Sequence, residues 1–139
     1  MIYLATRYSS GSVTDEELEQ RYRRAVEITA KLIEAGYVVV SPIVLSHPIS
    51  KLIGHKTDVD FWMEKDRILL AACHIVVVAA DPLWNTSKGV KMEIKLARKL
   101  HIPVLFCVEK EGRVDMISER HFLNPETQFK LIRRKFETI

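Results

Sequence analysis

The stretch that decides the fold runs from His74 to Leu100 and reads HIVVVAADPLWNTSKGVKMEIKLARKL. After the histidine come five apolar residues, 75–79, rich in β-branched side chains, which is typical of a strand buried on both faces. A polar loop follows, and from Val90 the apolar residues recur at helical spacing. A buried strand that leads through a loop into a helix N-terminus offers free backbone N–H groups and a favourable dipole to an anion. We therefore expect the functional site at this junction.

On both sides of this stretch, strands and helices alternate. We expect strands at 2–5, 37–40, 75–79 and 103–108, with a short additional edge strand possible at 113–117. We expect helices over 14–35 and 58–72, and two more that begin at 90 and at 124. Residues 42–57 contain two prolines, a glycine and two histidines, which predicts a long irregular loop. The alternation predicts a single α/β domain over residues 1–139, doubly wound like Rossmann or flavodoxin folds, with helices on both faces of a parallel sheet.

Right-handed crossovers favour the strand order 2-1-3-4, or 2-1-3-4-5 with the edge strand. This order places the first and third strands side by side, with connections that leave to opposite faces, and ligands bind at such a switch point. The loop at 6–12 should therefore meet the loop at 81–89 and Glu93 in one cleft.

The composition excludes several classes of function. The chain has 139 residues, 47% hydrophobic and 28% charged, with a net charge of +3, and no apolar run approaches the length of a membrane span. The mild charge does not indicate binding to a nucleic acid polymer. Arg7 interrupts the N-terminal apolar segment, so no secretory signal is expected, and Cys73 and Cys107 read as buried free thiols of a cytoplasmic protein. No metal-ligand spacing and no glycine motif for a nucleotide cofactor occurs, so we expect neither metal nor cofactor.

Two carboxylates, Glu93 and Asp66, are candidates for glycosyl chemistry, which uses a pair of acids. A position near a helix N-terminus should keep Glu93 ionised, as a nucleophile requires. From spacing alone, both acids are more readily explained as helix-surface residues in ion pairs. Ser87 and Gly89, with Thr86 and Lys88, either hold a phosphate or simply cap the helix.

Other residues also allow two readings. Arg7 follows a buried strand and is either a phosphate clamp or a partner in a rim salt bridge. Aromatic residues pack in the core more often than they stack on a base, and both interpretations apply to Tyr3, Phe61, Trp62 and Trp84.

The order of motifs resembles the nucleoside 2-deoxyribosyltransferase superfamily. The motifs are IYLA at the start, AGYVVVSPI, DRILLAACHIVVVA and SKGVKME, and together they cover roughly residues 1–108. Within that superfamily the chain resembles the 2′-deoxynucleoside 5′-monophosphate N-glycosidases. The segment SPIVLSHP, the FW pair before the acid and the tryptophan before the serine loop are similar to an uncharacterised bacterial and phage subgroup.

The resemblance implies a role for each matching residue. Glu93 matches the glutamate that attacks the anomeric carbon of deoxyribose, and Asp66 matches the aspartate that contacts substrate and assists proton transfer. Tyr3 matches a tyrosine that positions the nucleophile. Ser87 matches a serine that contacts the 5′-phosphate in the monophosphate hydrolases, and we expect Arg7 and Ser9 to contribute there.

We expect the remaining substrate contacts from residues 42–64, including His47, Phe61 and Trp62, and from Trp84 and Gly89 around the serine loop. The chain departs from the superfamily in having one glycine in its first loop and no tyrosine in its tail, KFETI.

The resemblance implies a homodimer or larger homo-oligomer and a small-molecule substrate. The expected function is hydrolysis of the N-glycosidic bond of a 2′-deoxynucleoside 5′-monophosphate. The alternatives are transfer of deoxyribose between bases, and nucleotide sensing without catalysis.

Overall fold

Two parallel strands, β1 (Ile2–Ala5) and β3 (Ile75–Ala79), form the centre of the sheet. Ile2 pairs with Ile75 and Ala5 with Val78, and along this register most of the side chains are buried. The structure, a computed structural model, describes residues 1–9, 13–54 and 58–127. The other elements are α1 (Asp15–Glu34), β2 (Val39–Val40), α2 (Pro42–Ile53), α3 (Val59–Ala71), η1 (Trp84–Thr86), α4 (Lys88–Lys99), β4 (Val104–Lys110), β5 (Arg113–Ser118) and α5 (Glu119–Phe122).

The strand order is β2-β1-β3-β4-β5, which confirms the predicted α/β fold and the order of its strands. The first four strands are parallel, whereas β5 pairs antiparallel with β4. The turn between them consists of Glu111 and Gly112, both with positive φ, at 53° and 78°. Two such residues are what a tight two-residue hairpin turn requires, so the edge strand returns directly along β4.

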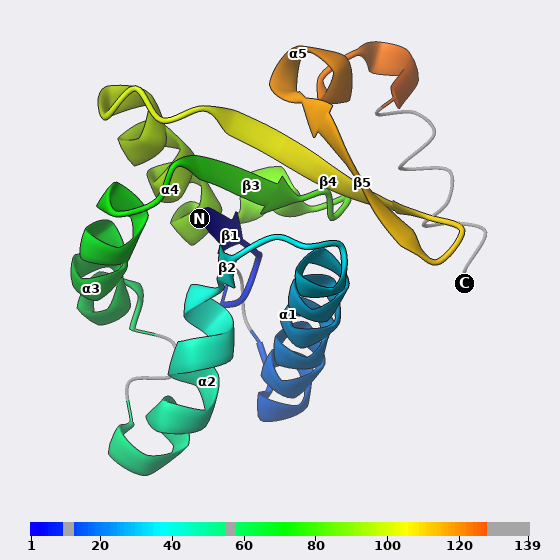
Figure 1. Cartoon of the computed structure of the whole chain (residues 1–139). Coiled ribbons are helices and arrows are strands. Elements are labelled where there is room, and N and C mark those ends of the chain that lie inside the picture. Colours follow the sequence, from blue (N-terminus) through cyan, green and yellow to red (C-terminus); the bar gives the residue numbers. More distant parts are fainter. Residues whose placement is uncertain (10–12, 55–57, 128–139) are drawn as a thin grey trace.

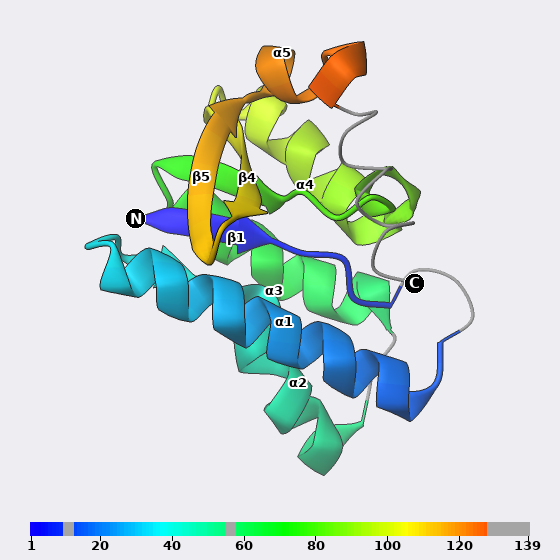
Figure 2. The same cartoon turned by 90° about the vertical axis from the view of Figure 1, so that its right-hand side faces the viewer.

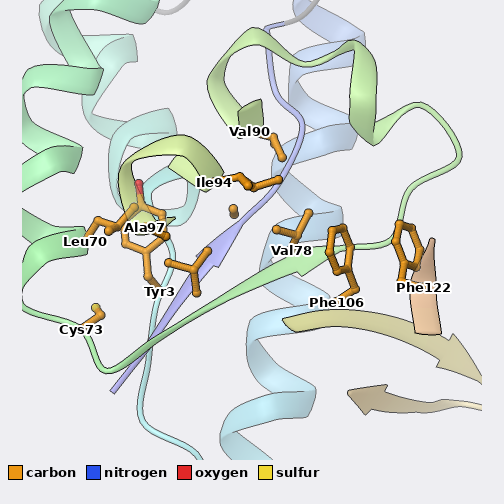
Figure 3. Close-up of a cluster of buried hydrophobic side chains, with 11 residues drawn as sticks. Tyr3, Leu70, Cys73, Val78, Val90, Ile94, Ala97, Phe106 and Phe122 are labelled. Atoms are coloured by element: carbon orange, nitrogen blue, oxygen red, sulfur yellow. The ribbon is translucent and has the colours of Figure 1, made fainter. Parts of the chain in front are cut away.

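The two faces of the sheet are covered by different helices (Figure 1, Figure 2). On one face, Tyr3, Val76, Val78 and Phe106 pack with buried residues of α3 and α4 and with Phe122 of α5 (Figure 3). On the other face, Ile2, Leu4, Val77 and Cys107 pack against Ile28 and Leu32 of α1. The connections from β1 and β3 therefore leave the sheet on opposite sides, as the sequence predicted.

The prediction of an irregular loop at 42–57 is wrong over most of that range, because residues 42–53 form α2. Ser41 accepts a hydrogen bond from the Val44 N–H at 3.3 Å, and Pro42 occupies the first helical turn, where no N–H is needed. Pro48 lies inside the helix and costs one backbone hydrogen bond. The prolines thus start and interrupt a helix rather than exclude one.

Two smaller differences concern element ends. The second strand is shorter than expected, 39–40 rather than 37–40, and α4 begins two residues earlier, at Lys88. The expected C-terminal helix falls mostly outside the described residues, although Asn124 accepts a hydrogen bond from the Glu126 N–H at 2.9 Å, as predicted for its cap. None of the described helices is both long and apolar enough to cross a membrane.

Candidate active site

A pocket of about 270 Å³ opens at the carboxyl ends of β1 and β3, where the sequence placed the switch-point cleft. Its walls come from the loop after β1, from α2 and α3, and from the start of α4. The residues that line it are Leu4, Thr6, Tyr8, Ser9, Pro42, Ile43, Ser46, Asp58, Val59, Trp62, Met63, Asp66, Thr86, Ser87, Lys88, Gly89 and Glu93. Of the expected site residues, the pocket brings together Glu93, Asp66, Trp62, Ser9, Ser87 and Gly89.

Glu93 lies in the second turn of α4 and points inward, with 6% of its surface exposed. Burial is the main cause that raises its pKa to about 8; the hydroxyl of Tyr3 acts in the opposite direction, and the nearby charge of Asp66 acts in the same direction as burial. The carboxyl is therefore mainly protonated at neutral pH in the unliganded protein. This differs from the expectation that the helix N-terminus keeps Glu93 ionised, because loss of solvation outweighs the helix dipole.

Tyr3 is close enough to Glu93 for the two side chains to affect each other's pKa. Its side chain is fully buried in β1, and its oxygen points away from the strand toward α4 (Figure 3). Within the described part of the chain, the hydroxyl has no hydrogen-bond partner of normal geometry. Burial and the charges of Glu93 and Asp66 raise its pKa, so the phenol stays protonated and can donate a hydrogen bond to an ionised Glu93.

Asp66 projects from the middle of α3 into the same pocket. Burial raises its pKa to about 6, and the Lys65 ammonium only partly offsets this effect. Two acids with raised pKa values now face one cavity, and pairs of this kind are typical of active sites. Trp62 and Met63, on the turn of α3 before Asp66, provide an apolar wall beside the carboxyl groups.

The start of α4 forms the polar end of the pocket. Ser87 is buried, and its Oγ accepts the Val90 N–H at 3.2 Å, so the serine is the helix cap. A cap at this position leaves other N–H groups of the first turn available to an anion. At Gly89 an added Cβ would meet only the Ser87 Oγ, at 3.9 Å, so the glycine leaves open space rather than relieving a clash.

The loop after β1 contributes residues that the sequence did not single out. Thr6 lines the pocket, and its buried hydroxyl has no hydrogen-bond partner among the described residues. A buried hydroxyl left without a partner costs about 1–3 kcal/mol, which a bound ligand can recover. The only sequence feature that could have indicated a role for Thr6 is its position, because it is the first residue after a buried strand.

His47 lies outside the pocket and instead holds its wall in place. Its ring is 2.6 Å from the Tyr8 hydroxyl and 2.7 Å from a Glu19 carboxylate oxygen, and it stacks on Tyr22 with centroids 4.3 Å apart. Lys51 also contacts Glu19, at 3.1 Å. This network, buried at His47 and Tyr8, joins α1, α2 and the first loop, so it fixes the position of Tyr8, which lines the pocket.

Three other expected contacts lie elsewhere. Arg7 pairs with Asp81 at 3.3 Å and lines a separate cavity on the α1 side of the sheet. Trp84 is partly buried and packs edge-on against Phe106 and Phe122 at the margin of the core. Phe61 packs against Trp62 and beneath the Lys65 ammonium, 3.7 Å from its ring centre.

Among the described residues, no three side chains of the metal-binding types converge. The pocket is lined by the carboxyl groups of Asp58, Asp66 and Glu93, the Tyr8 phenol, several hydroxyls, the Lys88 side chain and the start of α4. The buried Tyr3 phenol lies close to Glu93.

The raised pKa of Glu93 makes a prediction about stability. Below its ordinary value of 4.5 the carboxyl is protonated in both folded and unfolded chains, and between 4.5 and about 8 only the folded chain keeps the proton. Stability is therefore lost as pH rises through this window. Glu93→Gln removes the loss, so its melting temperature should exceed that of the wild type by on the order of 5–10 °C at pH 8, with little difference at pH 4.5.

The measurement is thermal unfolding followed by circular dichroism across this pH range. Glu64→Gln, an exposed position on α3, is the matched control and should follow the wild type. A constant offset between Glu93→Gln and the wild type at all pH values would contradict the assignment.

Comparisons with known proteins identify a family for the fold and the pocket. Residues 1–109 match a family described as a domain of unknown function, DUF1937. This match spans β1 to most of β4 and therefore includes every residue that lines the pocket. A comparison with curated proteins finds no match. The chain thus belongs to the DUF1937 family.

Proposed function

We propose that the chain is an N-glycosidase that hydrolyses the bond between base and sugar in a 2′-deoxynucleoside 5′-monophosphate. The observation that carries this proposal is that Glu93 and Asp66 face one pocket while the buried Tyr3 hydroxyl lies close to both. The same three residues match the catalytic group of the nucleoside 2-deoxyribosyltransferase superfamily, which the sequence resembles.

The two carboxyl groups support a double displacement when they share one proton. The reactive form is the one in which the shared proton has moved from Glu93 to Asp66. Ionised Glu93 then attacks the anomeric carbon, the bond from that carbon to the base nitrogen breaks, and the base keeps the electron pair and takes a proton from Asp66. Asp66 then removes a proton from water, whose oxygen attacks the same carbon and releases the Glu93 carboxylate. The Tyr3 hydroxyl favours the ionised form of Glu93 at the start of this cycle.

The shape of the pocket supports a nucleotide. Trp62 and Met63 give an apolar wall for a base beside Asp66, and the hydroxyls of Thr6, Ser9 and Ser87 provide donors at the polar end. The start of α4 adds backbone N–H groups and a positive dipole, which suit a 5′-phosphate. Arg7 has no part in this proposal, because it lies in the other cavity.

The reaction is tested by base release, measured by chromatography, from a panel of 2′-deoxynucleoside and ribonucleoside 5′-monophosphates and the matching nucleosides. We expect release from one or more of the 2′-deoxy monophosphates and a loss of at least 10³-fold in Glu93→Gln. Ser87→Ala should raise KM for the monophosphate more than it lowers kcat.

Glu64→Gln is again the matched control and should keep full activity. If a new nucleoside forms when a free base is added, the reaction is transfer of deoxyribose rather than hydrolysis. Nucleotide binding without base release from any substrate would contradict catalysis and favour a sensor.

The pH dependence of base release should be bell-shaped. Full activity needs one carboxyl protonated and one ionised, and the pKa values of Asp66 and Glu93, about 6 and about 8, bracket that state. We expect kcat/KM to be highest near pH 7, to fall below pH 6 as both carboxyls protonate, and to fall above pH 8 as the proton donor is lost. A rate that rises steadily to pH 10 would exclude Asp66 as proton donor.

We also propose that the chain is a cytoplasmic homo-oligomer. Its two cysteines are free and buried, which suits a reducing compartment. One face of α2 exposes Leu45, Ile49 and Leu52, the last with 87% of its surface in solvent, and a second copy would cover this apolar stripe. Light scattering should give at least twice the chain mass for the wild type and the mass of one chain for Ile49→Lys. A monomeric wild type would contradict the proposal.

A further inference from the structure

The outer face of α4 is a stripe of basic residues. Lys88, Lys91 and Lys95 are all exposed, and their spacing of three and four residues places them on one side of the helix. With a rise of about 1.5 Å per residue, the three ammonium groups extend over roughly 10 Å along the axis.

The stripe has no acidic counterpart. Glu93 is the only acid in α4, and it points inward to the pocket. Within the described ranges, none of the three lysine side chains takes part in an ion pair or a hydrogen bond. By contrast, Arg98 on the same helix pairs with Glu119. The positive potential along this face is therefore not neutralised within the described part of the chain.

The stripe is continuous with the active-site pocket. A groove of about 300 Å³ is lined by Thr86, Lys88, Lys91, Met92 and Lys95, and we call it the lysine groove. Thr86 and Lys88 also line the pocket, so the two spaces meet at the first turn of α4. A ligand whose phosphate lies at Ser87 thus has a basic path outward along the helix.

From this continuity we infer that the site also binds nucleotides with more than one phosphate, whose outer phosphates lie in the lysine groove. Lysine ammonium groups bind phosphates as point charges, without the fixed geometry that arginine imposes. The groove is short and has one apolar side chain, Met92. A single strand of nucleic acid would instead need aromatic stacking groups along its path. The inference rests on the proposed function only for the position of the nucleoside.

The test compares the affinities of the intact chain for the four 2′-deoxynucleoside 5′-monophosphates and their 5′-triphosphates. Titration calorimetry is run at low salt with a chelator present, so that no divalent cation screens the phosphates. A charge pair at the protein surface is worth a few-fold in affinity. We therefore expect the best triphosphate to bind on the order of 10-fold more tightly than its monophosphate, an advantage that shrinks as salt is added.

The variant Lys95→Glu should remove most of this advantage, because it lowers triphosphate affinity more than monophosphate affinity. Lys99→Glu is the matched control, one turn further along α4 and outside the groove, and should keep the advantage. Inorganic tripolyphosphate should compete with the triphosphate in the wild type and more weakly in Lys95→Glu.

Equal affinities for mono- and triphosphates, or equal effects of Lys95→Glu and Lys99→Glu, would overturn the inference. Base release measured in parallel separates this failure from failure of the proposed function. Base release without a preference for triphosphates would support the glycosidase and contradict phosphate binding in the lysine groove. A preference for triphosphates that depends on Lys95, found without base release, would support phosphate binding in the lysine groove and contradict the glycosidase.

Discussion

The pairing of β1 with β3 is the constraint on which the rest of the structure depends. These strands are separated by about 70 residues of chain, yet they are in register along four residue pairs at the centre of the sheet. Because the chain leaves β1 toward one face and β3 toward the other, a crevice opens where both strands end. Only this arrangement brings Thr6 and Ser9 close to Ser87 and Glu93. The strong burial of β1 and β3 therefore positions the pocket as well as stabilising the core.

A cost in stability is concentrated at the same place. Tyr3, Asp66 and Glu93 put three ionisable groups next to the apolar core, and burial shifts the pKa of each one upward. A buried carboxyl whose pKa rises to about 8 lowers the stability at neutral pH by an amount on the order of a few kcal/mol. A core built for stability alone would place apolar residues at these positions. The pocket is thus a strained part of an otherwise ordinary fold, which is the usual property of an active site.

The order of elements and the meeting of the two loops were predictable, because they follow from local apolar patterns and from general rules of chain crossover. The predicted topology was enough to bring the loop with Ser9, the loop with Ser87 and Glu93 together, whereas Asp66 was assigned to the site by the resemblance. Three features were not predictable for physical reasons. The helix α2 was not predicted because it contains Pro48, and a proline inside a helix is rare. Arg7 follows β1 by two residues, and the sequence does not say toward which face such a loop side chain turns. The protonation of Glu93 depends on how deeply the pocket is buried, which no single stretch of sequence encodes.

The helical repeat of α4 explains how one short segment serves two environments. With about 3.6 residues per turn, Val90, Glu93 and Ala97 face the sheet and the pocket, while Lys88, Lys91 and Lys95 face outward. The inward acid and the outward lysines are therefore separated by the width of the helix, and the lysines do little to lower the pKa of Glu93. Two opposite electrostatic conditions coexist: a buried carboxyl that keeps its proton, and an exposed surface that attracts anions toward the mouth of the pocket. An anionic ligand that reaches the first turn of α4 along this surface meets the pocket at Lys88 and Ser87, the point where the lysine groove and the pocket join.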